Sequence, residues 1–240
     1  MLPDHGAADP HTPTPDADDV LAALARHIDV SCVQAHHDLD DITALARDAR
    51  AGDFVSAHVL PNWLPRLREL LDGSNTLAGS PVSFPSGGAR TTVKVLEAQD
   101  LLAAGAQELD VVVAIGRLRS GDQAYVEREL AEVVAAVDGR VPLRAILEVG
   151  HLSDDEIRRG VDAALAAGIP WVKTGTGWSG IPTTVHHIEV IAERVQGRAG
   201  IKAAGGIRDR ATVEAMIALG VRRFGMNATA ALELVGTDSA

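Results

Sequence analysis

The chain has 240 residues, of which 46% are hydrophobic, and it carries a formal net charge of −11 at pH 7. This length and apolar content suffice for one large domain with a substantial core. The acidic balance argues against nucleic acid or an anionic membrane as the main partner, and an aromatic content of 3% disfavours a surface that stacks on bases.

The cellular location is predicted from cysteine use and targeting signals. Cys32 is the single cysteine, which excludes an internal disulfide and a cysteine-cluster metal site and fits a reducing cytoplasm. No stretch approaches the roughly 20 apolar residues of a membrane span, and the N-terminus lacks the basic start and apolar run of a signal peptide. We therefore expect a cytoplasmic protein.

The first residues differ in composition from the rest of the chain. Residues 1–19 are rich in Pro, Asp, Ala and His and have no apolar face to bury, so a flexible or loosely packed tail is predicted. Residues 20–240 show no break in composition and are predicted to form one domain.

From residue 20 onward, short β-branched runs alternate with stretches of helical spacing. Strands are predicted at 26–30, 53–59, 80–84, 108–114, 143–149, 169–174, 200–203 and 222–225. Helices are predicted at 39–51, 62–72, 88–104, 122–138, 153–167, 184–196, 209–219 and 228–235. These strand–helix units, with strands apolar on both faces, favour a single (β/α)₈ barrel of the α/β class. An open doubly wound sheet is the alternative, but the first strand lacks the glycine-rich turn expected after it.

The ends of several helices carry specific signals. Ser153 and Glu156 have the spacing of a capping box. Gly105, Gly168 and Gly220 follow helical runs and suit left-handed C-caps.

Polar side chains interrupt several strands near their C-terminal ends, where barrels of this kind carry functional residues. The interrupting residues are Asp29, His58, Asp110, Glu148, Lys173 and Lys202. A charge in an apolar run is costly unless it is paired or functional, so each of these residues is a candidate for the site.

Lys173 and Lys202 form the most informative pair. Lys173 lies in WVKTGTGW and Lys202 in GIKAAGG, so each follows an apolar residue and precedes glycines. On adjacent strands they would lie about 4.8 Å apart in the pairing direction and point into the barrel mouth. Two such ammonium groups disfavour each other's protonation, so at least one pKa is expected to fall, and a neutral amine suits Schiff-base chemistry with a carbonyl. The alternative is that both lysines extend to the surface and bind carboxylates there.

Two carboxylates are candidate partners of these lysines. Asp110 interrupts the apolar run QELDVVVA, where it can pair with a buried lysine, hold a water or act as a general acid or base. A purely structural ion pair, with Lys202 as the partner, is the alternative. Asp29 lies nearer a strand end, where helix capping explains it equally well.

Other residue types point to anion binding rather than to metal. The segments TGTG and AAGG supply unobstructed backbone N–H groups that suit phosphate, although ordinary turn chemistry explains them equally well. The histidine pairs at 36–37 and 186–187 lack a metal-ligand spacing, so we expect no metal site. The serines lack the GxSxG pattern of a nucleophile elbow.

Taken in order, these segments resemble the deoxyribose-phosphate aldolase family of class I (Schiff-base) aldolases, which have a (β/α)₈ barrel. The resemblance runs collinearly over about residues 20–235. Its markers are IDVS, VSFPSGGARTTVKVLEAQ, GAQELDVVV, LRAILEVGHLSDDEI, WVKTGTG and GIKAAGGIR.

The resemblance implies roles for four residues. Lys173 would form the imine with the substrate, and Lys202 would lower the pKa of Lys173 and assist proton movement. Asp110 would hold the water that shuttles protons, and Asp29 would orient this network. The implied reaction is reversible cleavage of 2-deoxy-D-ribose 5-phosphate to acetaldehyde and D-glyceraldehyde 3-phosphate, without a metal or an organic cofactor.

The implied phosphate site is only partly conventional for the family. Residues expected to bind the substrate and its phosphate are Gly177, Gly205, Gly206, Arg208 and Asn227. The family usually has small residues and serine where this chain has Met226 and Asn227, and a polar or basic residue near the position of Trp178. Gly175 also departs from the pattern, and His58 stands where many members have cysteine.

These departures keep two alternatives open. One is a related class I aldolase that acts on a different or non-phosphorylated sugar or keto substrate. The other is a non-catalytic barrel that binds a sugar phosphate. Barrels of this class are frequently dimers, so a homodimer is expected, with an aldehyde or sugar phosphate as the small-molecule partner.

Overall fold

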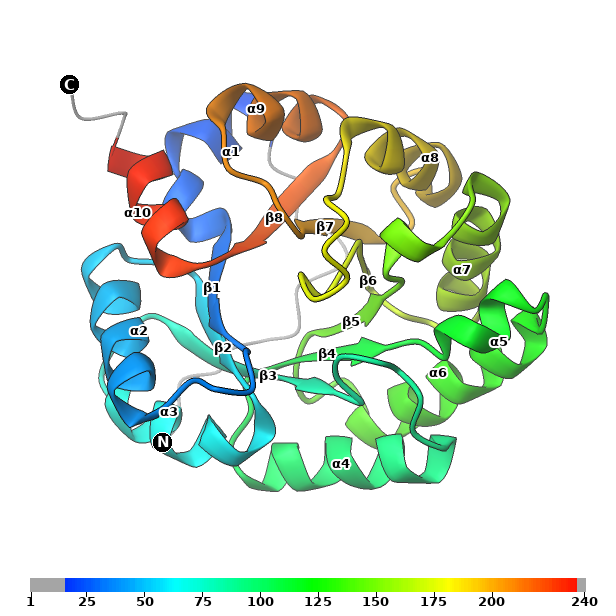
Figure 1. The fold of residues 1–240 in the computed structure, drawn as a ribbon, viewed down its shortest axis with the longest axis horizontal. Helices are drawn as coiled ribbons and strands as arrows, with labels where there is room; N and C mark the ends of the chain where they lie inside the picture. Colours follow the sequence, from blue (N-terminus) through cyan, green and yellow to red (C-terminus); the bar gives the residue numbers. More distant parts are fainter. Residues whose placement is uncertain (1–15, 237–240) are drawn as a thin grey trace.

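Eight parallel strands close into a barrel in chain order, and helices pack around its outside (Figure 1). The computed structural model describes residues 16–236. The strands are β1 Ile28–Cys32, β2 Ser56–Val59, β3 Leu77–Val82, β4 Glu108–Val112, β5 Leu143–Ile146, β6 Trp171–Lys173, β7 Gly200–Ala204 and β8 Val221–Met226. The helices are α1 Ala17–Ala22, α2 Leu39–Ala51, α3 Leu64–Leu70, α4 Thr91–Ala103, α5 Ile115–Arg119, α6 Gln123–Val137, α7 Asp154–Ala166, α8 Val185–Val195, α9 Arg210–Ala218 and α10 Ala228–Gly236. The predicted (β/α)₈ barrel is confirmed.

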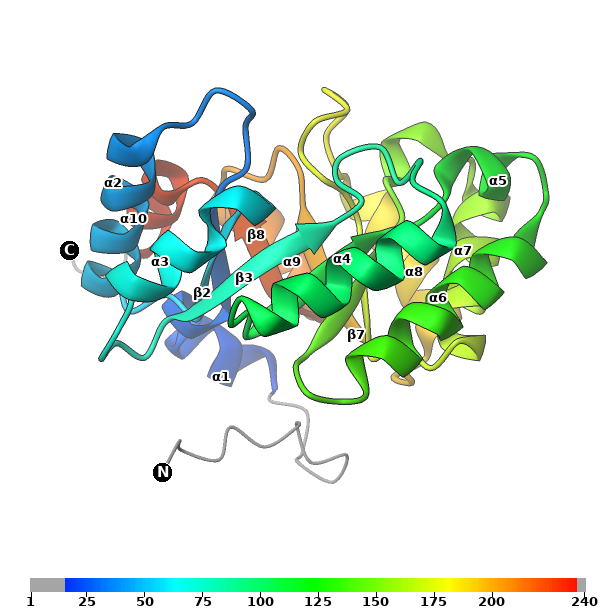
Figure 2. The ribbon, with the colours of Figure 1, turned by 90° about the horizontal axis from the view of Figure 1, so that it is seen from below.

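The start of the described chain differs from the prediction. Leu24–His27 form a 3₁₀ turn, so the first strand begins at Ile28 and Asp29 lies near its start rather than its end. Helix α1 covers the end of the barrel opposite the loops that follow the strands (Figure 2). The predicted tail boundary at residue 19 falls inside α1, and residues 1–15 lie outside the described residues.

The helix signals are confirmed. Ser153 and Glu156 form the predicted capping box at the start of α7. Gly105, Gly168 and Gly220 have φ angles of +92°, +81° and +100°, the left-handed conformation that ends a helix. Helix α5 was not predicted, because five residues are too few to show a helical period. None of the helices in the described range is long and apolar enough to span a membrane.

Side chains alternate between the two faces of each strand, and this alternation builds the site. Leu109 and Val111 of β4 belong to the hydrophobic cluster that the helices cover. Asp110, between them, points into the barrel and contacts Lys173 and Lys202 from other strands. Because successive residues of a strand face opposite ways, polar residues spaced by two converge inside the barrel.

A buried ion pair fixes the segment that follows β4. The fully buried side chains of Lys94 in α4 and Glu129 in α6 lie 2.8 Å apart. Lys94 Nζ donates to the carbonyl of Val112 at 2.7 Å, and Glu129 accepts from the N–H of Ala114 at 3.0 Å. Two helices therefore hold the end of the strand that carries Asp110.

Candidate active site

A cavity of about 430 Å³ lies at the C-terminal ends of the strands, where barrels of this architecture carry their sites. All the residues predicted for the site line it: Lys173, Lys202, Asp110, Asp29, Gly177, Gly205, Gly206, Arg208 and Asn227. The fold therefore gathers both predicted groups around one space.

The two lysines lie side by side in this cavity. Strands β6 and β7 pair with Lys173 opposite Lys202, as predicted. Both Nζ atoms donate to Asp110 Oδ2, at 2.7 Å from Lys173 and 2.9 Å from Lys202. Lys202 Nζ also lies 2.5 Å from Asp29 Oδ2. Lys202 is buried, whereas 12% of the Lys173 side chain is exposed, so Lys173 is the amine that a substrate can reach.

Two arginines that were not predicted as site residues bind the carboxylates from inside the barrel. Arg223 of β8 donates to Asp29 Oδ1 and to Glu108, each at 3.0 Å. Arg144 of β5 donates to Glu108 at 2.8 Å and to Asp110 Oδ1 at 3.1 Å. Asp29 is thus a buried member of an ion-pair network, and its interpretation as a helix cap is wrong.

His58 of β2 joins this network from the opposite side. Its Nε2 lies 3.2 Å from Glu108 Oε2, and its Nδ1 lies 3.9 Å from Asp110 Oδ2. The ring is buried, and burial lowers its pKa, as does the positive charge of Lys202. His58 is therefore a neutral side chain in the wall of the cavity at pH 7.

The neighbouring cations keep the carboxylates of the network ionised. Burial by itself would raise the pKa of Asp110, but Lys173 and Lys202 outweigh this effect and hold that pKa well below its usual value. Burial also acts to raise the pKa values of Glu108 and Asp29. The positively charged side chains around them outweigh burial and lower both pKa values.

The amine of Lys173 is poised for nucleophilic chemistry. Burial lowers its pKa from 10.5 to about 8; Asp110 opposes the shift and Lys202 adds to it. The predicted fall in pKa is confirmed, although burial contributes more than repulsion between the lysines. At pH 7 about a tenth of a group with this pKa is the neutral amine, which is the form that attacks a carbonyl.

Replacing Lys202 with methionine is expected to raise the pKa of Lys173 above about 8. The substitution removes a positive charge that lowers this pKa, and it leaves Asp110 free to stabilise the Lys173 ammonium more strongly. We expect the pH midpoint for borohydride trapping of acetaldehyde to move up by about one unit. A midpoint that stays in place would show that Lys202 acts by positioning alone.

The loops after β6 and β7 shape the backbone around the rest of the cavity. Gly177, Gly205 and Gly206 have φ angles of +80°, +105° and +76°, which side chains rarely adopt. A Cβ on Gly206 would lie 2.9 Å from the Cβ of Pro182. These glycines are therefore required by the shape of the loops, and they leave backbone groups open to the cavity.

Helix α10 begins at the cavity, directly after β8. The Asn227 side chain accepts from the N–H of Ala230 at 2.8 Å and caps this helix. The positive end of a helix dipole stabilises anions, so this edge of the cavity suits a negative group. Arg208, which is exposed, lines the same cavity and adds a full positive charge.

No protein-family model matches the chain, but individual relatives match it over most of its length. The deoxyribose-phosphate aldolase of Sinorhizobium medicae is 47% identical over 226 residues, which cover 94% of this chain and 91% of the relative. That of Klebsiella pneumoniae subsp. pneumoniae is 46% identical over 207 residues, 85% of this chain and 83% of the relative. This chain belongs to the deoxyribose-phosphate aldolase family. Among solved structures, the tetrameric deoxyribose phosphate aldolase of Aeropyrum pernix matches with a TM-score of 0.82 at 27% identity, covering 94% of this chain and 99% of that one.

Gly175, one departure from the pattern of the aldolase family, makes room for a buried carboxylate. The N–H and the hydroxyl of Thr176 both donate to Glu148 Oε2. A Cβ on Gly175 would lie 2.9 Å from Glu148 Oε1. The glycine thus allows Glu148 to order the loop that follows β6.

Trp178, another departure from the pattern of the aldolase family, contacts two other loops at the barrel mouth, which the loop after β6 crosses in Figure 1. Its backbone N–H donates to Thr176 Oγ1 at 2.9 Å. Its indole N–H donates to the carbonyl of Val33 in the loop after β1 at 3.1 Å. The ring also packs edge-on against Phe84 in the loop after β3, with 5.9 Å between centroids. Trp178 therefore connects the loops that follow β1, β3 and β6.

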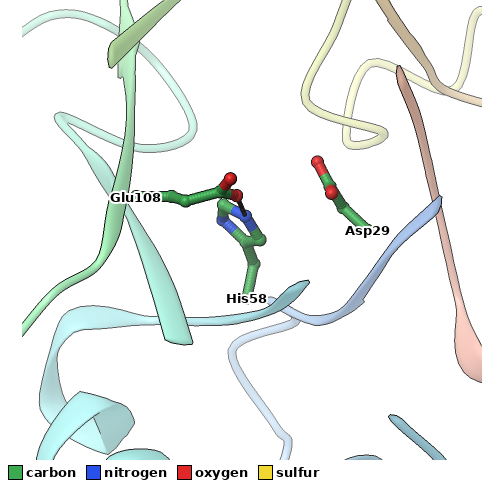
Figure 3. A group of neighbouring side chains, drawn as sticks. All are labelled: Asp29, His58 and Glu108. Atoms are coloured by element: carbon green, nitrogen blue, oxygen red, sulfur yellow. Dashed lines mark hydrogen bonds and ion pairs between the residues drawn. The ribbon is translucent and has the colours of Figure 1, made fainter. Parts of the chain in front are cut away.

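Asp29, His58 and Glu108 offer ligand atoms within 4.8 Å of one another, which is close enough to hold a cation (Figure 3). His58 and Glu108 face each other from β2 and β4, and Asp29 approaches from β1. Arg223 already binds both carboxylates, so a metal ion would have to displace a guanidinium. The three residues are better described as part of the ion-pair network.

Ser56 and Glu108, two buried polar residues that were not predicted for the site, share one signal in the sequence. Ser56 and His58 are spaced by two in β2, and Glu108 and Asp110 are spaced by two in β4. Polar residues with this spacing lie on one face of a strand. The spacing places Ser56 beside the candidate His58, and Glu108 beside the candidate Asp110.

Proposed function

We propose that the protein is a class I aldolase that reversibly cleaves 2-deoxy-D-ribose 5-phosphate to acetaldehyde and D-glyceraldehyde 3-phosphate. The observation that carries the proposal is the reachable amine of Lys173, with a pKa of about 8, held 2.7 Å from Asp110 inside the cavity. Membership of the deoxyribose-phosphate aldolase family, with relatives at 46–47% identity, supports the same reaction and substrate.

The proposed chemistry uses side chains of the chain alone. The neutral amine of Lys173 adds to the C1 aldehyde, and loss of water gives a protonated imine. The C3 hydroxyl then gives up its proton, the C2–C3 bond breaks, and its electron pair becomes the C=C bond of an enamine while C3 leaves as the aldehyde of glyceraldehyde 3-phosphate. Protonation at C2 and hydrolysis of the imine release acetaldehyde and restore the amine.

In this proposal each charged partner has a separate role. Lys202 helps to keep Lys173 unprotonated and donates to Asp110. Asp110, which is ionised and faces the cavity, exchanges protons with the substrate through water. Asp29, held by Arg223, fixes the position of Lys202.

The substrate phosphate is proposed to bind where glycine backbone and a helix N-terminus face the cavity. Gly177, Gly205 and Gly206 expose backbone groups there, Arg208 supplies a charge, and Asn227 caps α10. Met226, which also lines this region, offers no donor to an anion and supports the alternative of a non-phosphorylated substrate.

Comparing deoxyribose 5-phosphate with deoxyribose tests both the reaction and its substrate. A hydrogen bond to a charged group contributes about 1.5–3 kcal/mol, so we expect kcat/KM to be at least on the order of 10–100-fold higher for the phosphate ester. Acetaldehyde formation, followed with a coupled reductase, measures both rates. Equal rates would favour the non-phosphorylated substrate, and no cleavage of either sugar would leave only a binding role.

The assembly of the chain is proposed to be a homodimer. The solved structure of the relative from Aeropyrum pernix is described as tetrameric, so a tetramer is the competing outcome. Light scattering on the purified protein distinguishes these states.

A further inference from the structure

His58 occupies the wall of the cavity, and the proposed reaction gives it no role. It is 4% exposed and comes from β2, across the barrel from the two lysines. A polar ring in this position is costly to bury unless its nitrogens have partners.

The bond to Glu108 decides which ring nitrogen carries the proton. Glu108 also accepts hydrogen bonds from Arg144 and Arg223, and these cations lower its pKa. Its carboxylate is therefore ionised and acts only as an acceptor. At 3.2 Å from Glu108 Oε2, the Nε2 atom of His58 must therefore donate. In the neutral ring this leaves Nδ1 with a lone pair.

The lone pair of Nδ1 lies beside the carboxylate that both lysines contact. Nδ1 is 3.9 Å from Asp110 Oδ2, which is 2.7 Å from the Nζ of Lys173. Within the described chain, no hydrogen-bond donor reaches Nδ1. Two acceptors that stand about 4 Å apart can each receive one hydrogen of a single water molecule.

Gly79 sets the position of the ring. A Cβ at this residue would lie 2.4 Å from Cε1, 2.6 Å from Nε2 and 2.7 Å from Nδ1 of His58. The imidazole therefore packs flat against the backbone of β3, and any side chain at position 79 would push it away.

We propose that His58 is a positioning residue whose Nδ1 accepts, together with Asp110, the hydrogen bonds of the water that carries protons to and from the carbon beside the imine. The inference rests on the proposed Schiff-base function. In the direction of enamine formation, the C–H bond next to the protonated imine breaks and its electron pair forms the enamine C=C bond. The imine nitrogen recovers its lone pair, and the proton passes to the water, which hands a proton to the Asp110 carboxylate.

Two substitutions separate the nitrogens of His58. In His58→Asn the amide reaches the position of Nδ1 and keeps an acceptor there, whereas in His58→Gln the amide reaches the position of Nε2 and keeps the donor to Glu108. The test follows deuterium uptake at the methyl group of acetaldehyde in D₂O by NMR, because this exchange requires proton transfer but no cleavage. Misplacing a water that transfers protons costs on the order of 10–100-fold, so we expect His58→Gln to lose that much exchange and His58→Asn to lose less.

Borohydride trapping of acetaldehyde on Lys173 is the companion measurement, because it reports imine formation without C–H cleavage. We expect trapping to stay within about twofold in both variants. If the unaltered protein formed no adduct, the proposed function itself would fail. If the adduct forms normally but His58→Gln exchanges deuterium as fast as the unaltered protein, the proposal for His58 is overturned.

Gly79→Ala tests the same idea without changing any charged or polar group. The methyl group is expected to displace the ring and to reduce exchange about as much as His58→Gln does, with trapping retained. Gly116→Ala is the matched control, because a Cβ there meets nothing within 4 Å. A Gly79→Ala protein that folds and exchanges at the unaltered rate would also contradict the proposal.

Discussion

Lys173→Met is expected to abolish both the cleavage of deoxyribose 5-phosphate and the borohydride-stable adduct with acetaldehyde. Removal of a covalent nucleophile typically costs on the order of 10⁴-fold or more in rate, because the remaining groups cannot form the intermediate. The fold should survive, since Asp110 keeps Lys202 and Arg144 as partners and methionine resembles the apolar part of the lysine side chain.

Mass spectrometry of the reduced protein gives the decisive measurement for this variant. Lys202→Met is the matched control: it keeps the amine at position 173 and is expected to form the adduct with altered pH dependence. An adduct that persists in Lys173→Met and maps to Lys202 would reverse the roles of the two lysines.

Asp110→Asn is expected to lower kcat by about 10²–10⁴-fold, which is the usual contribution of a group that transfers protons. The same change should lower the pKa of Lys173 below about 8. The Asp110 carboxylate raises that pKa, so its removal makes the ammonium form of Lys173 less stable, while the positive charge of Lys202 remains beside it. The variant should therefore form the imine at lower pH while cleaving the substrate slowly.

The pH dependence of acetaldehyde trapping separates these two effects. For Asp110→Asn we expect the midpoint to move down, opposite to the shift expected for Lys202→Met. Asp155→Asn is a suitable control, because 80% of that side chain is exposed and its ion pair with Arg158 lies on the surface. An upward shift in Asp110→Asn would show that another group controls the protonation of Lys173.

Local sequence patterns predicted the barrel and the two strands that carry Lys173 and Lys202, because both depend on short-range information. The strand–helix alternation is visible in single segments, and the pairing of Lys173 with Lys202 follows once β6 and β7 are neighbours. The start of β1 was misplaced because Arg26 and His27 directly precede the β-branched run but belong to a 3₁₀ turn.

The rest of the site depends on contacts between residues far apart in the chain. Arg223 reaches Asp29 on the neighbouring strand β1 and Glu108 across the inside of the barrel, and the segment RRFG alone does not indicate these partners. Trp178 is explained only by its bond to Val33 and its contact with Phe84. Such pairings become visible only when the register and curvature of all eight strands are known.

The placement of lysines has a consequence for how this protein withstands aldehydes. Only three of its 22 lysine and arginine residues are lysines, and Lys94 and Lys202 are buried while Lys173 is reached through the cavity. The guanidinium groups that provide the other positive charges stay protonated and are poor partners for carbonyl addition. Within the described residues, an aldehyde thus meets a lysine amine only inside the pocket, and the outer surface offers no lysine to the reactive product that the enzyme is proposed to release.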